Sequence, residues 1–124
     1  MIDTKSSPKP GENTWLWLLK IASGVLIFAL LIIHLIVNHF VAPEGLLTYA
    51  DVVAYFQNPL VVVMEGVFLV FVVLHSLLGS RSILLDLNPS PGVLRAIDWF
   101  LSLFGLAAIV YGLWLLLTVA NQSV

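Results

Sequence analysis

Three long apolar segments constrain this chain more than any other feature of its sequence. They cover roughly residues 15–40, 59–80 and 93–120, and a helix needs about 20 residues to cross a bilayer. With 60% hydrophobic and 10% charged residues, the composition is that of a membrane protein rather than of a soluble domain. The sequence therefore predicts an all-α integral membrane fold with three transmembrane helices.

The segments outside the predicted helices are short and more polar. We expect a polar cytoplasmic tail over residues 1–14, a three-helix transmembrane domain over 15–120 and an external tail over 121–124. The first apolar run is about twice as long as that of a signal peptide, so it is predicted to be a retained span. The loop between the first two spans contains a short amphipathic stretch, which is expected to lie along the outer surface.

The positive charges predict the orientation. All five lie near the start of the first span or around the connection between the second and third, and they are Lys5, Lys9, Lys20, Arg81 and Arg95. By the positive-inside rule, the N-terminus is cytoplasmic, the C-terminus is external, and the chain lies in the cytoplasmic (inner) membrane. A net charge of −2 without a basic run gives no reason to expect nucleic acid, and the lack of cysteine excludes a thiolate-held cluster within this chain.

Ionisable residues at membrane depth are costly, so they are functional candidates. His34 and His39 occur in the first helix, and Glu65 and His75 in the second. Helical spacing places one histidine on a polar stripe of each helix. The first stripe contains Ser23, Ile27, His34 and Asn38, and the second contains Phe68, His75, Gly79 and Ser82.

A neutral imidazole in an apolar site is a natural axial ligand for haem iron. Gly79, one turn after His75, would leave room for the edge of the macrocycle. Arg81 lies near the cytoplasmic boundary, where a cation can pair with a haem propionate or a quinone oxygen. Asp86 follows in or near the inner loop.

Each of these residues also has a structural explanation. Either membrane histidine could hydrogen-bond a neighbouring helix, and His39 fits an interfacial position. Gly79 could serve only helix packing. Arg81 could be only a topology signal, and Asp86 a polar boundary residue. Glu65 could be an interhelical hydrogen-bonding group, although it lies at about the same depth as His34.

The pattern His-x3-Gly-x-Arg-x4-Asp, formed by residues 75–86, resembles the haem-ligand motif of membrane-anchor subunits of succinate dehydrogenases and fumarate reductases. "SGVLIFALLIIHLIVNHF" resembles the first helix of the di-haem anchors in that family, and "NPLVVVMEGVFLVFVVLH" continues the similarity. The resemblance implies that His75 and His34 are axial ligands of haem b and that His39 is not. It favours a D-type subunit paired with a C-type anchor. Leu87 departs from it, because D-type anchors often have a quinone-binding tyrosine there.

The resemblance implies a non-catalytic electron-transfer subunit of succinate:quinone oxidoreductase, a complex of the tricarboxylic acid cycle and the respiratory chain. Its three helices would form half of a bundle with a second anchor subunit. Together they would hold the flavoprotein and iron–sulfur subunits at the bilayer and relay electrons to or from quinone. The alternatives are a cytochrome b subunit of another quinone-linked dehydrogenase, or a haem-free helical scaffold or proton-conducting subunit.

Single-haem anchors of the family lack the ligand in the first helix, so the number of haems is argued from depth. At 1.5 Å per residue, His34 and His75 lie about 20 Å apart along the membrane normal. They cannot be opposite ligands of one iron, so two haems are expected, each with a second histidine from the partner anchor. Ser23, on the stripe of His34, is a further candidate cofactor-binding residue. Glu65 is expected to orient the outer site or to accept quinol protons.

Overall fold

The computed structural model describes residues 12–41 and 48–123, and within them all regular structure is helical. The elements are α1 (Thr14–Ile36), a π-helical turn η1 (Val37–Val41), α2 (Tyr49–Tyr55), α3 (Pro59–Leu85) and α4 (Pro91–Ala120). Three stretches are long and apolar enough to cross a membrane, namely Thr14–Phe40, Pro59–Leu85 and Pro91–Ala120. The predicted all-α fold with three transmembrane helices is confirmed.

The helices begin close to the predicted positions because the sequence supplies their caps. The side chains of Asn13, Asn58 and Ser90 accept hydrogen bonds from the first turns of α1, α3 and α4. A proline follows at the start of both α3 and α4, where its missing N–H costs nothing. The second span was predicted to end near residue 80, but α3 continues to Leu85. Residues 1–11 of the predicted tail lie outside the described residues.

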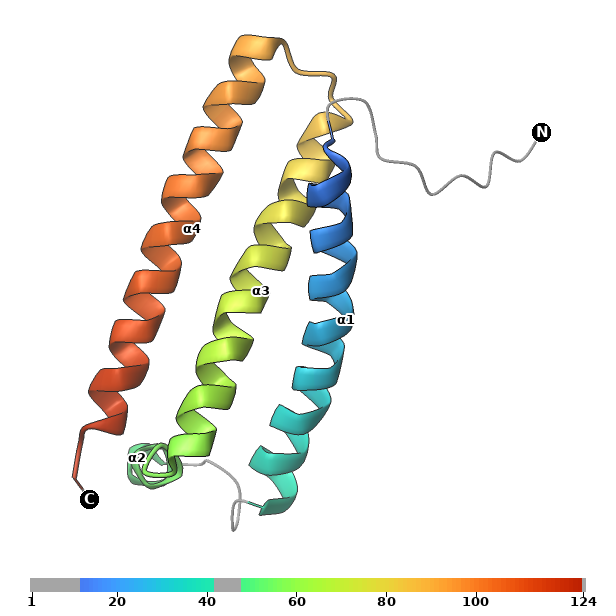
Figure 1. The fold of residues 1–124 in the computed structure, drawn as a ribbon. Helices are drawn as coiled ribbons and strands as arrows, with labels where there is room; N and C mark the ends of the chain where they lie inside the picture. The colour runs from blue at the N-terminus through green and yellow to red at the C-terminus, as the bar shows by residue number, and fades with distance from the viewer. Residues whose placement is uncertain (1–11, 42–47, 124) are drawn as a thin grey trace.

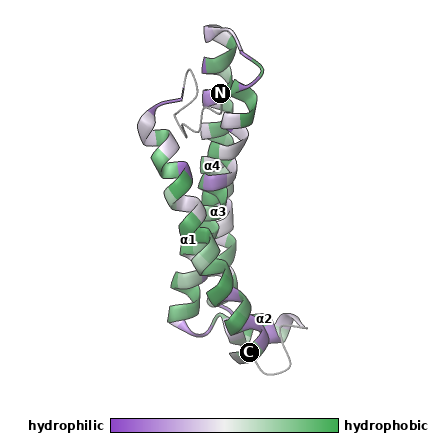
Figure 2. Cartoon of the chain, turned by 90° about the vertical axis from the view of Figure 1, so that its right-hand side faces the viewer, coloured by the Kyte–Doolittle hydropathy of each residue, from purple (hydrophilic) through white to green (hydrophobic). Residues whose placement is uncertain are grey.

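The three long helices form an open layer with α3 between α1 and α4 (Figure 1). Short α2 lies crosswise at the end of the layer that also holds the C-terminus (Figure 1). Most of each long helix is hydrophobic, whereas α2 combines hydrophobic and hydrophilic residues (Figure 2). Only 6–11% of the most apolar window of each span is buried within the chain. Most of this apolar surface is therefore left for lipid or for other protein subunits.

Glycines allow α4 to approach α3 closely. A Cβ atom added at Gly105 would lie within van der Waals overlap of Leu77, and one added at Gly112 would overlap Leu69. These contacts let leucine side chains of α3 fit against the backbone of α4, as small residues commonly do between membrane helices. The packing sets which turn of α4 lies beside which turn of α3.

Candidate functional site

The predicted polar stripes of α1 and α3 face one another in the structure. Their side chains form two clusters at different heights along the helices. The His75 cluster consists of Lys20, Ser23 and His75. The His34 cluster consists of His34, Asn38, Tyr55 and Glu65.

Hydrogen bonds in the His75 cluster define which ring nitrogen of His75 carries a proton. Nδ1 of His75 lies 3.1 Å from the backbone carbonyl oxygen of Lys20 and 3.1 Å from Oγ of Ser23. The Ser23 hydroxyl also donates to the Lys20 carbonyl, at 2.9 Å. Since a carbonyl oxygen can only accept, Nδ1 of His75 carries a proton. Nε2 is then the ring nitrogen that makes no hydrogen bond with the described residues. Ser23 lies on the predicted stripe of His34, is only 1% exposed, and contacts His75 on the facing helix α3.

Gly24 is a site residue that the sequence reasoning missed. A Cβ atom added at Gly24 would lie 3.0 Å from Cε1 of His75, which is closer than normal carbon–carbon contact. The His75 ring therefore lies directly against the backbone of α1. A glycine next to Ser23 was the available signal, but only the pairing of α1 with α3 gives it this meaning.

The His34 cluster joins α1, η1, α2 and α3 through hydrogen bonds. Nδ1 of His34 lies 2.8 Å and 3.0 Å from the two carboxyl oxygens of Glu65. The Tyr55 hydroxyl donates to Oε1 of Glu65 at 2.5 Å. The Asn38 amide donates to the His34 carbonyl at 2.7 Å and to the Tyr55 oxygen at 3.3 Å. A carboxylate oxygen only accepts, so the two short contacts with Glu65 favour the tautomer with the proton on Nδ1 of His34; the Asn38 amide nitrogen lies farther from Nδ1, at 3.2 Å.

Tyr55 has a role that was not predicted from the sequence. It is the last residue of α2, and its hydroxyl points toward Glu65. Partial burial, followed by the hydrogen bond to the Glu65 carboxyl, raises the pKa of Tyr55 above its usual value. The tyrosine is therefore a neutral hydrogen-bond donor at physiological pH. Sequence reasoning missed this role because Tyr55 lies outside the membrane spans.

The two clusters lie at different depths along α1. Eleven residues of α1 separate Ser23, beside His75, from His34, which corresponds to about 16 Å of helix rise. The separation of about 20 Å expected between the two histidines stays a prediction. The Lys20 ammonium donates to Oγ of Ser82 at 3.0 Å, so α1 is also joined to the last turn of α3.

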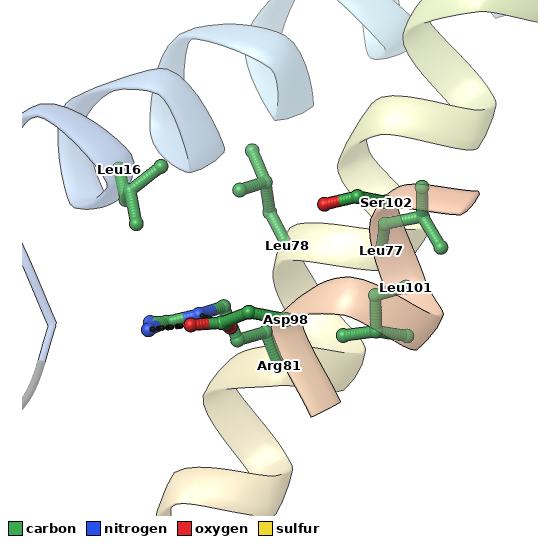
Figure 3. Close-up of a pocket in the computed structure, with 7 residues that line it drawn as sticks. All are labelled: Leu16, Leu77, Leu78, Arg81, Asp98, Leu101 and Ser102. Carbon is green, nitrogen blue, oxygen red and sulfur yellow. Dashed lines mark hydrogen bonds and ion pairs between the residues drawn. The ribbon is translucent and has the colours of Figure 1, made fainter. Parts of the chain in front are cut away.

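Arg81 forms an ion pair that was not expected from the sequence. Its Nε donates to Oδ1 of Asp98 at 2.6 Å, and Nη2 lies 3.3 Å from Oδ2. The pair joins α3 to α4 and borders an open cavity of about 240 Å³ (Figure 3). This cavity is lined by Leu16, Leu77, Leu78, Arg81, Asp98, Leu101 and Ser102. Two of the five N–H donors of Arg81 serve Asp98, and within residues 12–41 and 48–123 the other three make no hydrogen bond.

The remaining predicted residues have varied surroundings. A Cβ atom added at Gly79 would meet no other atom of the described chain within 4 Å, so the glycine borders open space. Asp86 is the C-cap of α3 and does not continue the helical stripe of His75. His39 lies in η1 at the end of the first span and is exposed.

The two histidines fit axial ligation of a haem better than binding of a bare metal ion. Among the described residues there is no cluster of three or more His, Cys, Asp or Glu side chains that could hold a metal ion. A haem brings its own equatorial ligands and needs only axial donors. In both histidines the hydrogen bonds to the described residues are made by Nδ1 and none is made by Nε2. The space beside Gly79 lies one turn from His75. The residues present therefore fit the group.

The fold and these clusters define an integral membrane protein with polar sites between apolar helices. Residues 4–113 match the family described as succinate dehydrogenase/fumarate reductase transmembrane subunit. The chain is also 32% identical over 103 residues to the succinate dehydrogenase hydrophobic membrane anchor subunit of Archaeoglobus fulgidus, an alignment that covers 83% of this chain and 87% of the relative. The chain belongs to this family of membrane-anchor subunits, and membership implies association with other subunits of the complex.

Proposed function

We propose that this membrane-anchor subunit binds haem b and relays electrons between the soluble subunits of its complex and quinone. The observation that carries the proposal is the state of the two histidines. In both His34 and His75, Nδ1 is the hydrogen-bonded nitrogen. The Nε2 lone pair of each ring is thereby available in an apolar setting, as an axial ligand requires.

In this proposal, His75 holds the haem near the end of the layer that contains Arg81, and His34 holds a second haem nearer α2. Bound haem supplies reversible one-electron transfer at its iron. Ser23 and the Lys20 carbonyl orient the His75 ring, and Glu65 orients the His34 ring. Because the two clusters lie at different depths, His34 and His75 would not bind the same haem. A second histidine for each haem would then come from another chain, which supports a partner anchor subunit.

Arg81 would serve the same end of the molecule. Its free N–H donors can bind a haem propionate or a quinone carbonyl at the cavity shared with Asp98. With Leu87 in place of the tyrosine common in D-type anchors, other hydroxyl donors to quinone would come from partner chains. Asp86 stays a candidate at the edge of this region.

We further propose that this end faces the cytoplasm, with the flavoprotein and iron–sulfur subunits bound there. Lys20 near the start of α1, Arg81 near the end of α3 and Arg95 near the start of α4 support this orientation in the cytoplasmic membrane. The external side would then contain α2 and the C-terminus.

Counting haems in single-alanine variants tests the proposal. Pyridine haemochrome analysis of the purified complex should give two b haems per flavin. His75→Ala and His34→Ala should each remove one haem, while His39→Ala, the matched control, should keep both. Unchanged haem content in His75→Ala or His34→Ala would refute the corresponding assignment. A complex with a single haem, lost only in His75→Ala, would leave His34 as a helix-packing residue.

A further inference from the structure

We propose that α2 contributes to the His34 site. Tyr55 of α2 is a positioning residue that acts on His34 through Glu65 and so changes the reduction potential of the haem held by His34. This inference rests on the proposed role of His34 as a haem ligand. It assigns a function to a helix outside the membrane spans, whose sequence indicated only a surface location.

Two consecutive hydrogen bonds connect α2 to the imidazole of His34. The Tyr55 hydroxyl donates to Oε1 of Glu65, and the same oxygen is the closer partner of Nδ1 of His34. The Asn38 amide approaches the Tyr55 oxygen from the other side. Tyr55 therefore has both a donor and an acceptor role filled, and its hydroxyl has a fixed orientation.

The position of Tyr55 is fixed by the packing of α2. Val53, two residues before the end of α2, is only 3% exposed. The Gln57 amide bonds the Val53 carbonyl at 3.0 Å and the Gln122 carbonyl at 2.9 Å. The start of α2 has a capping box between Thr48 and Asp51. The short helix is thus capped at its start. Just after its end, Gln57 is hydrogen-bonded to Gln122, which follows the last residue of α4.

A carboxylate that accepts from Nδ1 makes an imidazole a stronger electron donor to a metal. A stronger donor favours the ferric state and lowers the reduction potential. The Tyr55 hydrogen bond withdraws part of the Glu65 charge, so it weakens this effect. Tyr55 is therefore expected to raise the potential of the haem held by His34, and Glu65 to lower it.

Redox titration of the purified complex tests these opposite signs. Tyr55→Phe should shift the midpoint potential of the haem that His34→Ala removes to a lower value. Glu65→Gln keeps an acceptor without the charge and should shift the same midpoint to a higher value. The potential of the His75 haem should stay unchanged in both. Tyr49→Phe is the matched control, since Tyr49 is also in α2 but is 66% exposed.

The outcomes separate this inference from the proposed function. If His34→Ala retains both haems, the ligand assignment fails regardless of Tyr55. If His34→Ala removes one haem but Tyr55→Phe leaves its potential unchanged, the role of Tyr55 alone is refuted. Shifts of the same sign in Tyr55→Phe and Glu65→Gln would also refute it, because general loosening of the site would explain them.

A second variant addresses possible misassembly of Tyr55→Phe. Gln57→Ala keeps every side chain of the His34 cluster but removes the tie between α2 and α4. It should shift the potential of the His34 haem in the same direction as Tyr55→Phe, by a smaller amount. An unchanged potential in Gln57→Ala, with the haem retained, would refute the participation of α2.

Discussion

Adding a side chain at Gly24 should dislodge His75 without altering the histidine itself. The added Cβ of Gly24→Ala would lie 3.0 Å from Cε1 of His75. Normal carbon contacts are about 3.5–4.0 Å, so the ring must withdraw by about 0.5 Å or more. Gly24 lies one turn after Lys20 on α1, and withdrawal from that surface also lengthens the bond from Nδ1 to the Lys20 carbonyl.

The size of the effect follows from the hydrogen bond that is stretched. The separation of 3.1 Å between Nδ1 and the Lys20 oxygen would grow to about 3.6 Å, which is beyond hydrogen-bond range. An intramolecular hydrogen bond contributes about 0.5–1.5 kcal/mol. Losing the hydrogen bonds of His75 to the Lys20 carbonyl and to Ser23 should remove about 1–3 kcal/mol of the free energy that holds the ring in its orientation. Gly24→Val adds two further methyl groups and should cost more.

The assay is haem content together with the midpoint potential of the His75 haem. We expect partial loss or a shifted potential in Gly24→Ala and complete loss in Gly24→Val, with the haem of His34 retained. Gly66→Ala is the control, because its added Cβ would meet Leu113 at an ordinary 3.6 Å. A Gly24→Val complex with both haems at unchanged potentials would refute the close-contact reasoning.

Three other perturbations have defined outcomes. Gly105→Ala should reduce thermal stability of the complex by about 1 kcal/mol, because the methyl group of Leu77 must turn away, and Leu77→Ala in the same chain should remove that penalty. Arg81→Leu should lower quinone reductase activity more than assembly, whereas Asp98→Ala should cost about 1 kcal/mol or less of stability, since Asp98 is 42% exposed and its ion pair is screened. In an absorbance titration, Tyr55 should ionise only above the usual tyrosine range, because its pKa is raised. The hydrogen bond that Tyr55 donates to Glu65 should therefore be present below about pH 10 and be lost as the pH rises through the raised pKa. Ionisation of Tyr55 below the usual tyrosine range would contradict its burial beside Glu65.

The sequence was sufficient to predict the membrane class and the inward faces of two helices. Length and apolarity define the three spans because a bilayer accepts few other backbone structures. Helical spacing then identifies the polar stripes. The structure confirms that Ser23 and His34 of α1 contact α3, and it places Asn38, in η1, against Tyr55 of α2. Residues on one helix are related by fixed geometry, so their shared direction can be predicted without knowledge of a neighbour.

The hydrogen-bond partners of those residues lie on other helices, so they depend on how the helices pack together. Glu65 could be matched with His34 by depth, but Tyr55 comes from a short helix whose place depends on contacts with α4. Asp98 was overlooked because it lies near the start of α4, where a carboxylate can face water at little cost. Its pairing with Arg81 requires α3 to extend past residue 80.

The relative height of neighbouring helices determines which of their polar residues meet. No hydrophobic force sets this height between lipid-facing helices, so close packing at small residues must do so. Gly24 allows the His75 ring against α1, and Gly105 accepts Leu77 against α4. These contacts fix α1 and α4 relative to α3, and the heights of both histidine clusters follow from them. A substitution at either glycine should therefore disturb polar contacts at its own interface while leaving the helical stripes themselves intact.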